Sequence, residues 1–374
     1  MLGRIRSFLL GAGWPYGLTP FIPAAIAADL AHAPDTVIFA CSALGVVPTA
    51  ALMGRATEEL AERSGPGIGG LLNVTFGNAP ELIIALVALN AGLYEVVKAS
   101  LIGSILGNIL LVLGAAMAVG GIGRRAQRFN RTAASSQSSM LLVAAMAFTL
   151  PAIYVLSKGG SLPSPGAEAV RFDPAVERLS FALAVLLALT YLAGLAFSLV
   201  THRELFNPPS DENEEEAVAR KPWSVRRSVG LLALAGVAVA GMSEILVHSI
   251  SGAARSAGLT EFFIGAIVVA IVGNAAEHWV AVLVARKDKM DLSVGIAIGS
   301  SAQIALFVVP VLVLASFVIG PHPMPLVLNG FELGALLLAI LIANGVTNEG
   351  ESTWFEGVLL LATYAVLALA FAFA

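Results

Sequence analysis

The chain of 374 residues is too apolar for a water-soluble protein, since 57% of its residues are hydrophobic, 12% are charged and its mean hydropathy is +0.87. Soluble domains are about 45–50% apolar and about 25% charged. The net charge of −4 gives no basis for nucleic-acid binding, and the single Cys41 excludes an intrachain disulfide. The first apolar run is too short for a cleaved signal peptide.

Eleven apolar stretches approach the length of about 20 residues that a membrane-spanning helix needs. In chain order they cover residues 16–31, 34–60, 68–91, 96–120, 132–156, 179–201, 225–249, 262–285, 292–319, 326–346 and 355–373. The sequence therefore predicts an all-α polytopic membrane protein with 11 transmembrane helices.

Lysine and arginine are unevenly divided between the two sets of loops. If the N-terminus is cytoplasmic, 16 of the 21 basic residues fall on the cytoplasmic side and five on the other side. Because loops rich in lysine and arginine stay in the cytoplasm, this bias predicts a cytoplasmic N-terminus and a C-terminus on the outside.

A Gly-Asn-Ala-x-Glu run occurs twice, at 77–81 and at 273–277, with an offset of 196 residues. The same offset relates the Gly-Ser pairs at 103–104 and 299–300. A carboxylate at the middle of a bilayer costs about 2.5–3.5 kcal/mol or more. Helix packing by small residues could explain one copy. Two copies in register, each with a glutamate, favour a cation site shared by two halves.

The motifs divide the chain into two units of five helices, at 34–201 and 225–374, after an N-terminal region at 1–33. An odd number of helices per unit forces opposite orientations, so the repeats are expected to be inverted and to share a site near the midplane. The linker at 202–224 is expected to be cytoplasmic, and its run 211–216 holds five acids. That run is either a solvated connection or a segment that concentrates cations near the entrance.

The repeated motifs contain oxygen ligands that suit a hard cation. The glutamates supply charge, the asparagines supply amide oxygens, and the glycines permit an irregular backbone whose carbonyl groups can bind an ion. Ca²⁺ takes 6–8 such oxygens, while Mn²⁺ and Na⁺ remain open. The expected metal-binding residues are Gly77, Asn78, Glu81, Gly273, Asn274 and Glu277.

Other polar residues in or beside the apolar stretches are expected to line a path for protons and cations. One helical step turns His278 away from the neighbouring glutamate, so we expect it to assist the site without binding metal. Glu244 lies inside an apolar run, whereas Glu58 and Glu59 lie near an interface and could simply be solvated; Glu332 is expected to be interfacial. The expected pathway residues are Glu81, Glu277, Ser104, Asn108, Glu244, Ser300, Gln303, His278, Glu58 and Glu59.

Paired carboxyl groups in a membrane suggest how transport could be coupled. Burial disfavours the ionised form of a carboxyl group, and a second carboxylate nearby disfavours it further. Two protonated acids are neutral, and two ionised acids that hold Ca²⁺ are also neutral. Exchange of a cation for protons is therefore the predicted mechanism.

The residues at 77–83 and 273–278 also carry a family resemblance. They read Gly-Asn-Ala-Pro-Glu-Leu-Ile and Gly-Asn-Ala-Ala-Glu-His. The chain resembles the cation/proton exchanger (CAX) family of the Ca²⁺/cation antiporter superfamily, which has Thr in place of Pro80. Residues 56–61, the acidic linker, Ser243-Glu244 and the segment 350–357 are similar to that family as well. The resemblance implies Ca²⁺ export or sequestration driven by a proton gradient, with Glu81 and Glu277 as the central carboxylates.

The resemblance further implies a lipid bilayer as the surroundings, Ca²⁺ and protons as the transported ions, and no cofactor. A bacterial inner membrane is the expected location, and homo-oligomerisation is left open. The nearest rival is a Na⁺/Ca²⁺ exchanger, which would show extra Asp and Ser or Thr where this chain has Ala and Pro in its motifs. A Mn²⁺ exchanger, a cation channel and an intramembrane hydrolase are further alternatives, and the five histidines form no pattern typical of the hydrolase.

Overall fold

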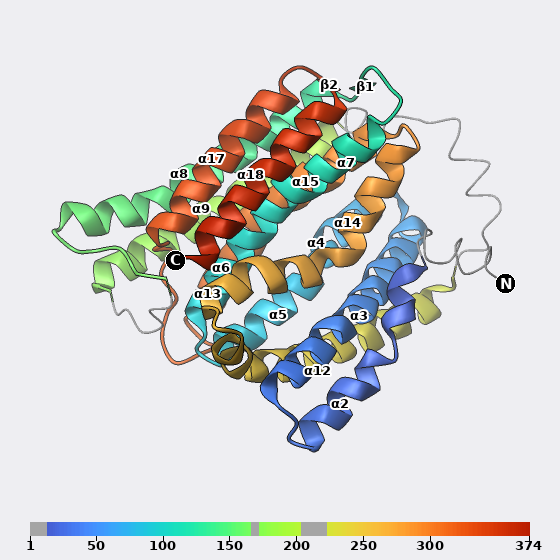
Figure 1. The fold of residues 1–374 in the computed structure, drawn as a ribbon. Coiled ribbons are helices and arrows are strands. Elements are labelled where there is room, and N and C mark those ends of the chain that lie inside the picture. Colours follow the sequence, from blue (N-terminus) through green and yellow to red (C-terminus); the bar gives the residue numbers. More distant parts are fainter. Residues whose placement is uncertain (1–12, 166–171, 203–222) are drawn as a thin grey trace.

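Residues 13–165, 172–202 and 223–374 are described by the structure, a computed structural model of the chain, and helices dominate them (Figure 1). The acidic run 211–216 lies outside these residues. The strands β1 (Gln127–Arg128) and β2 (Glu351–Ser352) pair antiparallel and join two loops. The expected all-α architecture is thus accompanied by one two-residue bridge.

The elements fall into two sets, before and after residue 202. The first set contains η1 (Trp14–Leu18), α2 (Phe21–Leu30), α3 (Asp35–Arg63), α4 (Gly65–Gly77), α5 (Ala79–Asn90), α6 (Tyr94–Leu106), the π-helix η2 (Gly107–Val112), α7 (Leu113–Gly120), α8 (Arg131–Ser157), α9 (Pro174–Ala196) and the π-helix η3 (Phe197–Thr201). The second contains α12 (Val225–Ala257), α13 (Glu261–Phe263), the π-helix η4 (Ile264–Val269), α14 (Ala270–Arg286), α15 (Met290–Gln303), the π-helix η5 (Ile304–Val308), α16 (Val309–Ala315), α17 (Gly330–Thr347) and α18 (Trp354–Ala372).

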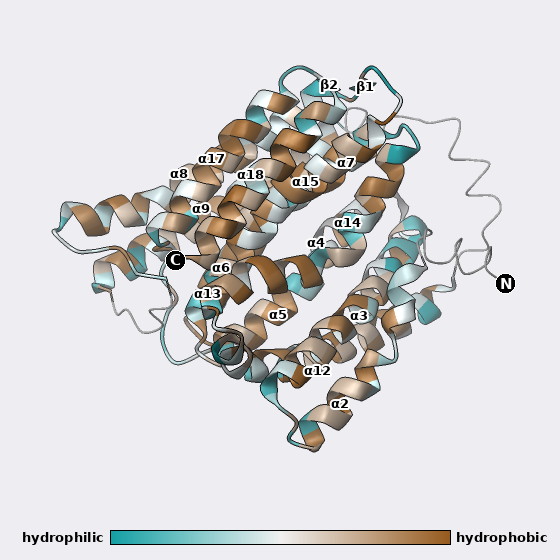
Figure 2. Cartoon of the chain, in the orientation of Figure 1, coloured by the Kyte–Doolittle hydropathy of each residue, from teal (hydrophilic) through white to brown (hydrophobic). Residues whose placement is uncertain are grey.

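Ten helical segments of the described residues are long and apolar enough to cross a membrane. Apolar residues follow these segments, and polar residues gather in the loops around β1 and β2 (Figure 2). The predicted crossing at 16–31 is divided, because η1 is a short 3₁₀ turn and Pro20 begins a new helix, α2. The ten residues of α2 rise about 15 Å, which is half a bilayer core, so the predicted count of eleven is not confirmed.

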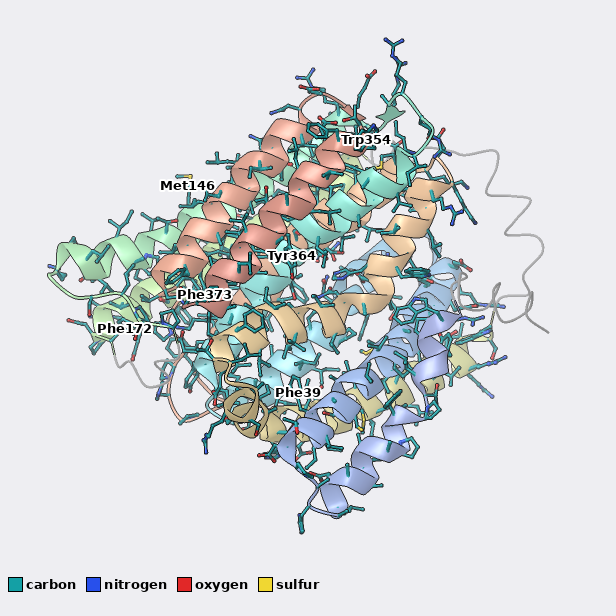
Figure 3. All side chains as sticks on the ribbon, viewed as in Figure 1. Phe39, Met146, Phe172, Trp354, Tyr364 and Phe373 are labelled. Atoms are coloured by element: carbon teal, nitrogen blue, oxygen red, sulfur yellow. The ribbon has the colours of Figure 1, made fainter. Side chains whose placement is uncertain are left out.

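Large apolar side chains point outward from the bundle (Figure 3). Met146 on α8, Trp354 at the start of α18 and Phe373 are exposed by 68%, 52% and 90%. Exposed apolar helix faces are unfavourable in water and suit lipid. Tryptophan at a helix end is typical of the membrane–water interface.

The motif helices lie between two groups of helices. α3 and α12 pack along each other with α2 beside them, at the lower right of Figure 1. α5 contacts α12, and α14 contacts α3, so both motif helices rest on this pair. On its other side α14 contacts α6, α7 and α15. This layering places both repeated motifs in the interior.

Two close backbone contacts hold the inner helices together. Every residue of α6 is buried, and a Cβ atom at Gly103 would overlap the carbonyl oxygen of Ala266 in η4. A Cβ atom at Gly357 of α18 would likewise overlap the backbone of α7. Small residues at helix crossings allow such approach, which in a membrane provides much of the packing energy.

A buried charge cluster joins α6 to α17. The ammonium group of Lys98 pairs with Glu95 and donates to the carbonyl oxygen of Val327 at 3.1 Å. Glu332 is 0% exposed, forms a capping box with Asn329, and lies close enough to Lys98 for electrostatic attraction. The capping box and Lys98 stabilise this carboxylate at the start of α17, and the interfacial position of Glu332 stays a prediction.

The Gly103 contact predicts a clear stability effect. Gly103→Ala should lower the melting temperature in detergent, because the added methyl group must displace the η4 backbone, and overpacking costs about 1–3 kcal/mol. Gly236→Ala on α12 is the control, since a Cβ atom there meets nothing within 4 Å. The control should be neutral or slightly stabilising, because alanine favours a helix over glycine. Equal melting temperatures for the two variants would contradict the proposed contact.

Candidate cation-binding site

The first motif lies at a helix break. α4 ends at Gly77, Asn78 has φ −95° and ψ 17°, and α5 begins at Ala79. Proline is favoured in the first turn of a helix because it has no N–H group to pair there, and Pro80 occupies this turn. Glu81 therefore lies in the first turn of α5, where the free N–H groups of a helix favour negative charge.

The second motif lies within a continuous helix. α14 runs from Ala270 to Arg286 through the whole motif, and the irregular segment is the π-helix η4 that precedes it. Ala276 stands where the first motif has Pro80. The two motifs are thus similar in sequence but differ in backbone conformation.

The carboxyl groups of Glu81 and Glu277 come together from these two helices. Glu81 is 8% exposed, Glu277 is half-buried, and the two groups interact electrostatically. A Cβ atom at Gly273 would lie 4.0 Å from Oε1 of Glu81. The glutamate of the first motif therefore rests against the glycine of the second.

Neutral polar groups connect each motif to a helix of the other half. The Asn78 amide donates to Oε1 of Gln303 at 2.5 Å. The Asn274 amide donates to Oγ of Ser104 at 3.1 Å and to the carbonyl oxygen of Ala270 at 3.0 Å. These bonds fix the direction in which the two amide oxygens point.

Two further hydrogen bonds complete the group. The Ser300 hydroxyl donates to Oε2 of Glu277 at 3.1 Å. Nε2 of His278 lies 3.0 Å from Oδ1 of Asn108, at the start of η2. The structure thus brings together eight of the predicted pathway and metal residues, namely Asn78, Glu81, Ser104, Asn108, Asn274, Glu277, Ser300 and Gln303, with Gly273 and His278 beside them.

The group leaves buried oxygen atoms without hydrogen-bond donors. Oε2 of Glu81 and Oδ1 of Asn274 are both buried and unpartnered. An unpaired buried acceptor costs about 1–3 kcal/mol, and more when it is charged. Among the described residues, no three His, Cys, Asp or Glu side chains form a group that could hold a metal ion by themselves. The donor set is therefore two carboxylates with neutral oxygens, which suits a hard cation.

The remaining predicted residues lie at the edge of the group or outside it. Glu58 is exposed but close enough to Glu277 for electrostatic repulsion. Oε2 of Glu59 accepts a hydrogen bond from the backbone N–H of Trp223 at 2.7 Å. Glu244 faces a separate pocket between α5 and α12. At Gly77 a Cβ atom would meet nothing within 4 Å.

Sequence reasoning missed two neighbours of the site. Nε2 of Gln137 on α8 would lie 3.1 Å from a Cβ atom at Gly299, next to Ser300. The ring of Trp14 packs edge-on against Trp279, with 5.9 Å between ring centroids. Neither residue belongs to a repeated motif, and only the tertiary fold brings them here.

The fold is that of a multi-pass membrane protein, and two carboxyl groups from its repeated motifs lie close together in its interior. Residues 35–200 and 227–373 match the family model described as "Sodium/calcium exchanger protein". The chain belongs to this family.

Individual relatives and a solved structure are similar to this chain over nearly its whole length. The "Ca(2+)/H(+) antiporter" of Synechocystis is 45% identical over 95% of this chain and 96% of its own length. The "Ca(2+)/H(+) antiporter ChaA" of Bacillus subtilis is 42% identical over 99% of both chains. The solved structure of native YfkE is 38% identical, covers 96% of this chain and 100% of its own, and has a TM-score of 0.80. These relatives confirm the resemblance to cation/proton exchangers.

A fold likeness extends to a more distant structure. The crystal structure of the H⁺/Ca²⁺ exchanger CAX covers 96% of this chain and 91% of its own, with a TM-score of 0.69 and 15% identity. It shows that the arrangement of helices is shared.

The contact between His278 and Asn108 predicts energetic coupling between α14 and η2. His278→Ala and Asn108→Ala should each lower the free energy of unfolding, and the double variant should lose less than the sum. The expected coupling is about 0.5–1.5 kcal/mol, the net value of one hydrogen bond. A double-mutant cycle from denaturation in detergent measures this value. Strict additivity of the two losses would contradict the bond.

Proposed function

We propose that the chain is a Ca²⁺/H⁺ antiporter that binds Ca²⁺ and protons alternately at Glu81 and Glu277. The observation that carries this proposal is a pair of interior carboxylates, one from each copy of a repeated motif, with unpaired oxygen atoms between them. Among the described residues, the ion pairs found involve other acids. The relatives named as Ca²⁺/H⁺ antiporters support both the two ions and their exchange by antiport.

Charge balance explains why exchange would be coupled. One Ca²⁺ ion held by two ionised glutamates is neutral, and so are the same glutamates with two protons. The empty, ionised pair is costly because removing the partner of a buried charge costs about 3–5 kcal/mol. The carboxylates and Oδ1 of Asn274 would supply the protein ligands, and water or backbone oxygens would complete the shell of 6–8 oxygens.

The helix boundaries support two repeats at the offset of 196 residues. α6 begins at Tyr94 and α15 at Met290, which are 196 residues apart. The π-helices η2 and η5 follow them at matching positions. Gly92 and Asp288, again 196 apart, both have positive φ angles, of 79° and 64°. Each unit contains five of the ten candidate crossings, and this odd number makes the repeats inverted.

Residues 14–30 support an eleventh, broken crossing. Ile22 lies against Gly45, and the Tyr16 hydroxyl lies 3.5 Å from the carbonyl oxygen of Ala51, so η1 and α2 run antiparallel to α3. Lys98 is buried, so it does not count as a basic residue of the outer loops. Without it, the excess of basic residues on the proposed cytoplasmic side is larger. We therefore keep the N-terminus in the cytoplasm and the C-terminus outside, in a bacterial inner membrane.

Differences between the repeats support a state that is open to the cytoplasm. On the proposed orientation, η4 lies near the outer face and packs tightly on α6. α4 holds the matching place at the cytoplasmic face, but it packs on α3 and η3. Glu58, which is exposed and near Glu277, lies on this side. When alternating access opens the site to the other side, η4 would lose its tight packing and α4 would gain a matching contact.

Neutral replacements test the carboxylates. Glu81→Gln and Glu277→Gln should each slow proton-driven Ca²⁺ transport in proteoliposomes by more than about tenfold, because one ligand charge and one proton site are lost. Glu349→Gln is the matched control, since Glu349 is exposed and lies in the loop after α17. Near wild-type transport by either motif variant would refute the two-glutamate site, provided that the variant inserts normally.

Competition between protons and Ca²⁺ predicts the pH dependence. Apparent Ca²⁺ affinity should fall as the loading side is acidified from about pH 8 to about pH 5.5, because both ions bind the same carboxylate oxygens. Equilibrium Ca²⁺ binding checks this directly.

A parallel transport assay with a Na⁺ gradient in place of the proton gradient should give no uptake. Affinity that is flat with pH, or uptake driven by Na⁺, would count against the proposal.

A further inference from the structure

A pocket with three polar side chains lies outside the central site, between α5 and α12. Its volume is about 400 Å³. Asn90, at the end of α5, and Glu244 and His248 of α12 line it, and the other lining residues are aliphatic. The proposed exchange at Glu81 and Glu277 uses none of these three side chains.

The two α12 side chains are exposed to the pocket and lack protein partners. Neither Glu244 nor His248 forms a hydrogen bond or ion pair among the described residues, although both lie within a predicted crossing. A carboxylate at this depth does not face lipid without a partner. Aliphatic walls supply no donor. A bound water molecule or cation would supply the missing partner.

The spacing of these residues suits one metal ion. Glu244 and His248 are four residues apart, so their Cβ atoms lie about 5–6 Å apart on one helix face. This spacing lets two side chains of one helix bind the same ion. Asn90 adds an amide oxygen from the opposite helix. On the same face, one turn further along α12, Gly252 lies against the carboxylate of Asp35 at the start of α3.

The imidazole distinguishes this pocket from the central site. Imidazole suits Zn²⁺ and similar transition metals, whereas carboxylate and carbonyl oxygens suit Ca²⁺. The central donor set contains only oxygens that face the ion, while the pocket combines nitrogen, carboxylate and amide ligands. The imidazole of His248 and the carboxylate of Glu244 are ligand types that Zn²⁺ takes in proteins, and the Asn90 amide and water would complete the four-coordinate shell that it prefers.

We propose that Asn90, Glu244 and His248 form a second metal site, specific for Zn²⁺-class divalent ions, that bridges α5 and α12. α5 carries Glu81, and α12 packs on α3. An ion bound to both helices ties the motif helix to the outer helix pair. Zn²⁺ supplied from the outer side of the membrane then slows any movement of α5 relative to α12.

Direct binding tests this site without relying on transport. The full-length chain carrying Glu81→Gln and Glu277→Gln is titrated with Zn²⁺ by calorimetry in detergent, so that the central site is weakened in every sample. Adding His248→Gln or Asn90→Ala should weaken Zn²⁺ binding by at least about tenfold, since even indirect partners of metal ligands contribute 10–100-fold. His202→Gln is the control, because the His202 ring stacks on Phe197, away from the pocket.

A replacement ligand separates metal binding from a structural role. His248→Cys should restore Zn²⁺ binding to within about tenfold of the parent chain, because thiolate is a good Zn²⁺ ligand. Zn²⁺ affinity that is unchanged by His248→Gln and Asn90→Ala would overturn the proposal. Loss of binding in His248→Cys as well as in His248→Gln would also overturn it. Because calorimetry requires no exchange activity, these outcomes are independent of the Ca²⁺/H⁺ proposal.

Discussion

Negative charge in the membrane interior is the constraint on which the rest of this structure depends. Glu81 and Glu277 lie among apolar helices, where an unpaired carboxylate is costly. The fold meets this constraint only in part. Ser300 donates to Glu277, and the start of α5 favours negative charge at Glu81. Oε2 of Glu81 and Oδ1 of Asn274 accept no hydrogen bond from the described residues. In the proposed exchange, Ca²⁺ would bind both oxygen atoms, and a proton would neutralise the carboxylate in its place.

The hydrogen bonds around the carboxylates also determine which parts can move. Asn78 is joined to Gln303, and Asn274 to Ser104, so each motif is attached to a helix of the other half. The contact at Gly103 adds a tight backbone packing between α6 and η4. These connections favour a rigid centre. A change in access is therefore expected in the helices outside this centre.

Local patterns predicted much of this architecture. The two glutamates, their register and ten of the crossings follow from repeated motifs and apolar runs, and the break between α4 and α5 lies at the motif glycine and Pro80. The continuous path of α14 is understandable from Ala276, but the π-helices have no local sequence signal. Gln137 approaches the site from α8. Such contacts depend on tertiary packing, which a single sequence does not display.

A comparison of two buried acid pairs separates structural charge from functional charge. Glu95 and Glu332 share Lys98, whose ammonium group also donates to a backbone carbonyl, and this cluster joins α6 to α17. The register places Val294 where the first repeat has Lys98. Among the described residues, no lysine forms an ion pair with Glu81 or Glu277. The ammonium group of Lys98 is covalently attached to the chain, so its connection between the two helices is permanent. A bound metal ion can leave, so a connection through it is reversible. The same electrostatic attraction thus stabilises the scaffold in one place and supports transport in the other.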